Sequence, residues 1–122
     1  MKKESILRDK SYLFAIRIIR LSQFLQQEKK EYILSKQVLR SGTAIGALIR
    51  EAEYAQSHAD FINKFSISLK EANETAYWLS LVKDTDYIDL KLYKSIFQDC
   101  DELICLLVST IKTLKAKTTL NS

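Results

Sequence analysis

The sequence predicts an all-α protein, an antiparallel up-down-up-down four-helix bundle, with a single domain over residues 1–122. Proline is absent and glycine occurs only twice, so the tight turns of a sheet-rich fold lack their usual residues. Hydrophobic residues make up 47% and charged residues 28%, which is the balance of a globular protein with a packed core. Apolar residues also recur three and four positions apart in four successive segments, the spacing of one face of a helix.

The first helix is expected over residues 6–29 and has two sets of apolar residues. A buried seam follows alternating spacings of four and three: Phe14, Ile18, Leu21 and Leu25. A second set lies off this seam and spreads apolar surface around the helix: Leu13, Ile16, Ile19 and Phe24. Because one copy of so small a chain offers little to cover the second set, the sequence predicts that copies associate.

The second helix is expected over residues 35–55, with Ser35 as its N-cap. Two glycines lie inside it, and each interior glycine costs about 0.5–1 kcal/mol relative to alanine. Close approach of another helix would offset this cost, so Gly42, Gly46 and Ala47 are expected to form a narrow helix-packing face. The same spacing occurs in dimers of membrane helices, but the charged residues beside it argue against a membrane partner.

The third helix is expected over residues 58–83, because Ser57 and Asp60 have the spacing of a capping box ahead of a periodic apolar run. The fourth helix is expected over residues 87–115. Two aspartates are candidates for its N-cap: Asp86 and Asp89. The residues after 115 carry little apolar weight and are expected to fray.

Nineteen basic against fifteen acidic side chains give the chain a net charge of +4. Such a surplus attracts phosphate, although many ordinary globular proteins carry as much. Five basic residues are candidate contacts to nucleic acid or to another subunit: Lys10, Arg17, Arg20, Arg40 and Arg50. Charges of both signs on the second and third helices also predict an ion network within or between subunits: Arg50, Glu51, Lys70, Glu71 and Glu74.

The residues for catalysis or metal binding are few, since the chain has one histidine and two cysteines. We therefore expect no enzyme activity, no cofactor and no metal. Cys100 and Cys105 are five positions apart, which on a helix points the two thiols away from each other. Free thiols, together with the lack of a secretory signal or a membrane-spanning run, predict a cytoplasmic protein with no membrane partner.

Two long segments carry a family resemblance. LRSGTAIGALIREAEYAQS at residues 39–57 and DFINKFSISLKEANETAYWLSLV at residues 60–82 resemble the small bundle proteins called 23S rRNA intervening-sequence proteins. With the flanking helices, the likeness covers nearly the whole chain. Three positions depart from the family, which often has Ser, Asn and Ala there: Ala44, Leu48 and Ser68.

The resemblance implies an antiparallel four-helix bundle that commonly assembles as a ring-like homopentamer. The chain is also similar to the accessory bundle proteins of diversity-generating retroelements, which associate with nucleic acid and a reverse transcriptase. The family offers no catalytic residues to carry over. We expect a non-enzymatic oligomer that binds copies of itself and acts as a module associated with RNA or DNA. The alternative is a protein-interaction scaffold with no nucleic-acid role.

Overall fold

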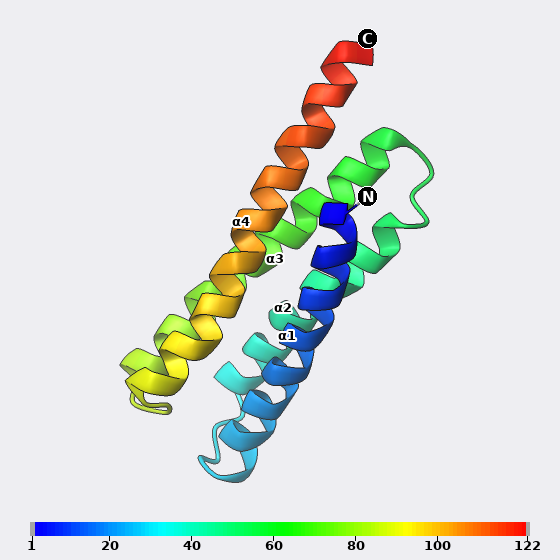
Figure 1. Cartoon of the computed structure of the whole chain (residues 1–122). Helices are drawn as coiled ribbons and strands as arrows, with labels where there is room; N and C mark the ends of the chain where they lie inside the picture. The colour runs from blue at the N-terminus through cyan, green and yellow to red at the C-terminus, as the bar shows by residue number, and fades with distance from the viewer. Residues whose placement is uncertain (1, 122) are drawn as a thin grey trace.

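The computed structural model describes residues 2–121, with side chains up to Thr118, and all its regular structure is helical. The helices are α1 (Lys2–Gln27), α2 (Leu34–Ala52), α3 (His58–Asp84) and α4 (Leu90–Asn121). In Figure 1 the chain runs down α1, back up α2, down α3 and up α4. The predicted all-α fold with four helices is confirmed, and the described residues contain no strand.

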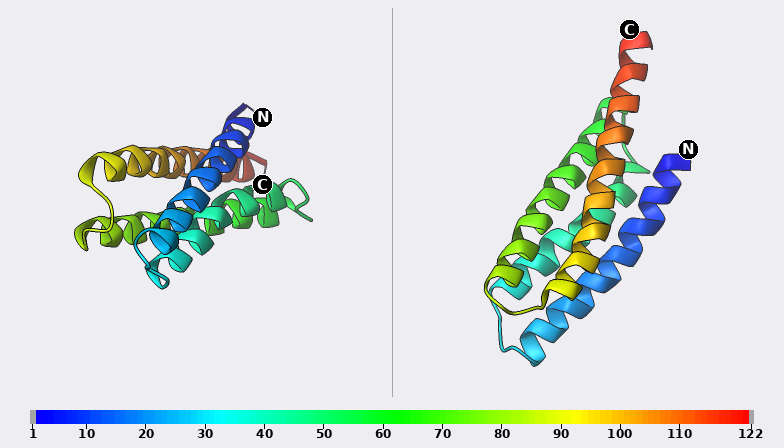
Figure 2. Two further views of the ribbon diagram at one scale, coloured as in Figure 1. Left: turned by 90° about the horizontal axis from the view of Figure 1, so that it is seen from below. Right: turned by 60° about the vertical axis from the view of Figure 1, so that its left-hand side comes forward.

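The four helices do not pack equally. The contacts of α2 with α3 and with α1 are the most extensive, those of α3 with α4 are intermediate, and those of α1 with α4 are the sparsest. The left view of Figure 2 shows α1 crossing the direction of α4 at an angle. One long side of the bundle is therefore less tightly closed than the others.

The core follows the periodicity of the sequence. The predicted seam of α1 is buried at all four positions: Phe14, Ile18, Leu21 and Leu25. Each fully buried Leu, Ile or Phe side chain contributes roughly 1.5–3 kcal/mol relative to leaving it exposed. The other helices supply the opposite wall, which includes Ile45, Phe65, Leu79 and Leu103.

The start of α2 differs from the sequence prediction. The helix begins at Leu34, its N-cap residue is Ile33, and no side chain of that residue caps it, so the prediction of Ser35 as N-cap is wrong. The carboxylate of Glu31 performs this task instead. Its Oε1 accepts hydrogen bonds from the backbone N–H of Ile33 at 3.1 Å and of Ser35 at 2.8 Å. Two of the donors that a helix start leaves unpaired are satisfied in this way.

The remaining helix ends have identifiable causes. The α2 helix ends at Ala52 rather than 55. The backbone N–H groups of the next three residues donate to carbonyls three positions earlier, as in a 3₁₀ turn, and that of Ala55 donates to the Ala52 carbonyl at 3.1 Å. The predicted cap of α3 is confirmed, since the Ser57 hydroxyl accepts from the Asp60 N–H at 3.0 Å. Of the two candidate caps for α4, the chain uses Asp89, whose Oδ1 accepts from the Leu92 N–H at 2.8 Å.

The outer helices are longer than the sequence indicated. The first helix begins at Lys2 rather than 6, and Lys3 Nζ donates to the Ser109 hydroxyl on α4 at 2.7 Å. The last helix continues to Asn121 rather than stopping at 115, and Figure 1 shows it extending past the ends of its neighbours. The predicted end of this helix at 115 is therefore wrong, whereas the fraying of the tail stays a prediction. Neither glycine nor proline occurs in the last turns, so nothing there stops the helix.

Within residues 2–121, none of the helices combines the length and apolar character that crossing a membrane requires.

Candidate interaction surface

The outward face of α1 carries large apolar side chains that no other helix covers. Tyr12 and Leu13 are 62% and 63% exposed, and Ile19 and Phe24 are also exposed. Tyr12, Ile16 and Ile19 are spaced four and three apart, so they share one side of the helix. Contiguous exposed apolar surface on a small protein is typical of a contact with another protein. We call these five residues the α1 outer face: Tyr12, Leu13, Ile16, Ile19 and Phe24.

Two ion pairs connect α1 to α4 along the open side of the bundle. Lys10 Nζ lies 2.8 Å from Glu102 Oε1, and Arg17 Nη1 lies 2.8 Å from Asp99 Oδ2. The hydrogen bond and charge of Glu102 raise the pKa of Lys10 above its usual value. Between these pairs lies a cavity of about 430 Å³, whose apolar wall includes Leu13. Two of the five candidate cations are therefore neutralised inside the protomer.

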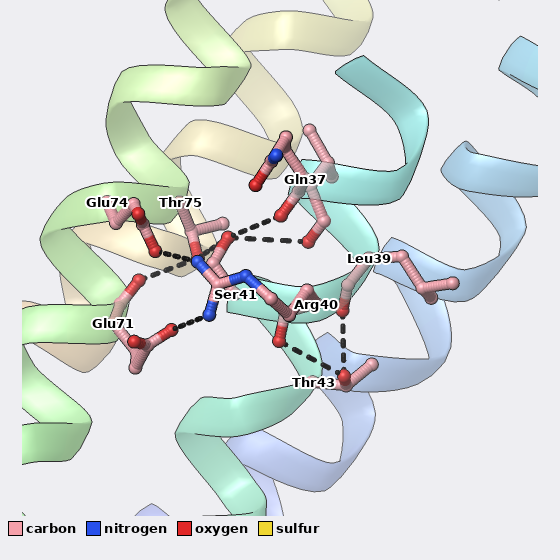
Figure 3. A network of polar contacts seen from close by, with 9 residues as sticks. Gln37, Leu39, Arg40, Ser41, Thr43, Glu71, Glu74 and Thr75 are labelled. Atoms are coloured by element: carbon pink, nitrogen blue, oxygen red, sulfur yellow. Dashed lines mark hydrogen bonds and ion pairs between the residues drawn. The ribbon is translucent and has the colours of Figure 1, made fainter. Parts of the chain in front are cut away.

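A third candidate, Arg40 on α2, is the centre of a polar network with α3 (Figure 3). Its Nη1 donates to Glu71 Oε2 at 3.0 Å, and its Nη2 donates to Glu74. The hydrogen bond to Glu74 is the main cause that raises the pKa of the Arg40 guanidinium. Directly beside it, the buried Thr75 hydroxyl donates to Ser41 Oγ at 2.9 Å. The network joins two helices of the same chain.

The other predicted members of the ion network lie elsewhere. Among the described residues, Arg50 and Lys70 make no ion pair with the acidic groups assigned to them, and Glu51 is 3.9 Å from Lys64 instead. Arg50 and Arg20 are exposed. Arg50 borders a hollow of about 220 Å³ beside Tyr12 and Ala47. These two arginines are the candidate cations without an ion-pair partner in the described part of the chain.

The glycines of α2 pack against α1. A Cβ atom on Gly42 would lie 2.7 Å from Ile18 Cγ2, and one on Gly46 would lie 3.1 Å from Ser11 Oγ. Both residues therefore allow two helices of one protomer to approach closely, which is the use that the sequence predicts for them. Ala47, grouped with them in the prediction, is exposed and does not belong to this contact.

A further basic segment, which spans the connection between α1 and α2 and the first turn of α2, escaped the sequence analysis. Lys29, Lys30 and Lys36 are exposed, and so is Tyr32 between them. The signal in the sequence was the string KKEYILSK, in which an aromatic residue stands among lysines.

His58 and Cys100 contact main-chain carbonyl groups. His58 Nε2 lies 3.3 Å from the Leu114 carbonyl oxygen. Burial raises the pKa of the Cys100 thiol to about 12, and its Sγ is 3.3 Å from the Ala72 carbonyl oxygen. Cys105 is exposed and is not bonded to Cys100. Among the residues that could be searched, no group of three or more His, Cys, Asp or Glu side chains is placed to hold a metal ion.

Comparison with known proteins gives a consistent family relationship. A family model described as 23S rRNA-intervening sequence protein matches residues 3–109. A crystal structure from Bacteroides thetaiotaomicron VPI-5482, of a protein with unknown function from the S23 ribosomal protein family, is similar with a TM-score of 0.89. The two sequences are 58% identical, over 90% of this chain and 98% of the other. The comparison with curated proteins found no match.

Proposed function

The chain belongs to the family of 23S rRNA-intervening sequence proteins, and from that premise we propose that it is a non-enzymatic, oligomeric four-helix bundle that associates with RNA or DNA. The observation that carries the proposal is the α1 outer face, which is apolar, exposed and bordered by arginines without ion-pair partners. The chemistry of such a surface is that of assembly and of anion binding, rather than of turnover.

The assembly that we propose is a ring-like homopentamer of antiparallel bundles. Tyr12 and Leu13 are too exposed to contribute much to the fold of one protomer, and burial against a second copy would remove their apolar surface from water. Five copies of +4 carry about +20 in one particle, so assembly concentrates a modest charge. Arg20 and Arg50 are the candidate cations that remain available for an external partner.

The contacts of the two residues best suited to catalysis support a non-enzymatic role. The Cys100 thiol is buried with a pKa of about 12, which disfavours the thiolate required for nucleophilic attack. His58 contacts a main-chain carbonyl rather than a second catalytic side chain. We place the protein in the cytoplasm, because the free Cys100 and Cys105 suit a reducing compartment.

Light scattering on the purified protein tests the assembly. We expect a mass that is a multiple of the 14.1 kDa protomer, and a fall to 14.1 kDa in Leu13→Asp. The matched control is Leu90→Asp, which places the same charge at another exposed leucine away from α1. A wild-type protein that is folded and monomeric at micromolar concentration would overturn the proposed oligomer, as would an unchanged mass in Leu13→Asp.

Binding of RNA and DNA oligonucleotides at two salt concentrations tests the nucleic-acid role. Phosphate contacts release counterions, so the affinity must fall as salt rises. Absence of binding at 50 mM salt, or binding that does not depend on salt, would contradict the association.

A scaffold that binds only proteins is the second candidate function. It is favoured by one observation: Lys10, Arg17 and Arg40 are paired with carboxylates inside the protomer and are thus less available to phosphate. In a scaffold, Arg50 would contact an acidic residue of the neighbouring copy. Arg50→Glu would then dissociate the oligomer, whereas the nucleic-acid role predicts an intact oligomer with weaker oligonucleotide binding.

A further inference from the structure

The chain from the end of α1 to the first turn of α2 carries an aromatic side chain that lysines flank in the sequence. Tyr32 is 51% exposed, and Lys29, Lys30 and Lys36 are exposed on either side of it. We propose that this segment, which we call the lysine loop (residues 29–36, the connection together with the first turn of α2), binds single-stranded nucleic acid. The three lysines contact phosphates, and a base stacks on the Tyr32 ring. The inference rests on the proposed association with RNA or DNA and assigns that association to a part of the chain.

The charge of the lysine loop is not neutralised within the chain. Lys30 and Lys36 have no carboxylate within ion-pair distance among the described residues, and Lys29 Nζ lies 5.8 Å from the centre of the Phe24 ring. This distinguishes the three lysines from Lys10 and Arg17, which are ion-paired to α4. Binding of phosphate by Lys30 and Lys36 therefore breaks no ion pair of the described chain.

The acidic residue inside the loop is withdrawn from its surface. Glu31 is buried, and its carboxylate accepts the N–H groups of Ile33 and Ser35. Its negative charge is therefore directed toward the start of α2 rather than toward a ligand. Glu28 is the acidic side chain that remains exposed beside the lysines.

Hydrogen bonds hold the loop in one shape before any ligand arrives. The Glu31 N–H donates to the Leu25 carbonyl at 2.9 Å, which closes the end of α1. The Ser35 hydroxyl donates to the Glu31 carbonyl at 2.8 Å, and the Ser22 hydroxyl donates to the Ser35 carbonyl at 3.1 Å. A preformed loop loses less conformational entropy on binding than a flexible one.

The side chains of the loop favour nucleic acid over a lipid surface. Single-strand binders combine positive charge along the nucleic-acid backbone with aromatic rings on which bases stack, and residues 29–36 carry exposed lysines and the exposed Tyr32 ring. Ile33 is 74% exposed, but it is the one aliphatic side chain of the loop that is fully directed to solvent. Stable binding to a bilayer usually needs a larger apolar surface.

The test measures the affinity of the full chain for fluorescent dT15 and U15, which distinguishes DNA from RNA. We expect Lys29→Gln/Lys30→Gln/Lys36→Gln to weaken binding at least tenfold at 50 mM salt. Since each phosphate contact to a single strand contributes about 0.7 to the slope of log K against log salt, three lost contacts should reduce the slope by about 2. Tyr32→Ala should weaken binding severalfold, whereas Tyr32→Phe keeps the ring and should bind like the wild type.

The matched control removes three exposed lysines elsewhere, in Lys70→Gln/Lys91→Gln/Lys94→Gln, and should lose much less affinity. If the wild type binds neither oligonucleotide, the proposed function itself fails, and the lysine loop with it. If the wild type binds but the loop variant and the control lose affinity equally, only the assignment to the loop is wrong. Vesicles with phosphatidylglycerol are the remaining probe. One result would identify a lipid site and overturn the inference: vesicle binding that Ile33→Ser abolishes, together with an oligonucleotide affinity that the triple-lysine variant leaves unchanged.

Discussion

Gly42 on α2 faces Ile18 on α1 so closely that a Cβ atom at Gly42 would lie 2.7 Å from Ile18 Cγ2 and 3.2 Å from Ile18 Cβ. Ile18 is fully buried, and its Cβ is attached directly to the helix backbone. An added methyl group therefore requires the two helices to move apart. This contact explains why a residue with poor helix propensity occupies the middle of α2.

Gly42→Ala is expected to destabilise the protein. Overpacking a core costs about 1–3 kcal/mol, and the gain of alanine over glycine in a helix returns only about 0.5–1 kcal/mol. Urea unfolding followed by circular dichroism should show a lower midpoint. Gly46→Ala is the control, because the added Cβ would have the Ser11 hydroxyl as its nearest neighbour, at 3.1 Å. The loss of stability in Gly46→Ala should be the smaller of the two. A Gly42→Ala protein as stable as the wild type would disprove the close contact.

Lys30→Gly is expected to stabilise the chain. Lys30 has a φ of 56°, in the left-handed region that costs a side chain about 1–2 kcal/mol. Glycine avoids this cost but has a more flexible unfolded state, so the net gain should be about 0.5–1 kcal/mol. Thermal and urea unfolding measure the change. Lys29→Gly, one residue earlier and outside the left-handed region, should give no such gain; equal effects at both positions would contradict the assignment to backbone conformation.

The two thiols are expected to react at very different rates. With a pKa of about 12, Cys100 is almost entirely protonated at pH 8, and it is buried. Ellman's reagent should therefore modify the exposed Cys105 rapidly and Cys100 only after unfolding. Cys105→Ala should leave the native protein nearly unreactive. Rapid reaction of that variant under native conditions would show that Cys100 is accessible.

The raised pKa of Cys100 also sets a direction for stability against pH. Above pH 9.0, the ordinary pKa of a thiol, Cys100 stays protonated in the folded state, whereas in the unfolded state it loses its proton. The unfolded state then binds fewer protons, so the free energy of unfolding falls as pH rises from about 9 toward 12. In Cys100→Ala, the free energy of unfolding should therefore fall less between pH 7 and high pH than it does in the wild type. An unchanged slope in the variant would contradict a buried, protonated thiol.

Arg40→Gln is expected to destabilise the protein by about 0.5–1 kcal/mol, the upper part of the range for partly exposed ion pairs. The reason is that Arg40 connects α2 to Glu71 and Glu74 of α3. The effect should diminish in 1 M salt. Arg50→Gln, at an exposed arginine without such partners, should change the stability by less than about 0.3 kcal/mol in the monomer. Equal effects of the two substitutions would mean that the network does not act within the protomer.

The sequence predicted the helices better than the site because the two depend on different information. The seam from Phe14 to Leu25 is a local pattern, and a helix must bury it wherever it packs. Arg17 is different, since its carboxylate partner Asp99 lies 82 positions away in the sequence. No spacing rule connects these two positions, so the five candidate cations could not be divided into paired and unpaired before the structure was known.

The sequence by itself determined that the chain forms four helices around an apolar core, that its glycines serve a close helix contact, and that Ser57 caps the start of the third helix. These features depend on residues within a few turns of one another. Only the tertiary structure decided that α1 is the helix against Gly42, that Arg40 rather than Arg50 joins α2 to α3, and that Glu31 caps α2 while leaving three lysines exposed. The physical reason is that charge pairing and close packing depend on distances across the bundle, which are fixed only when the helices pack.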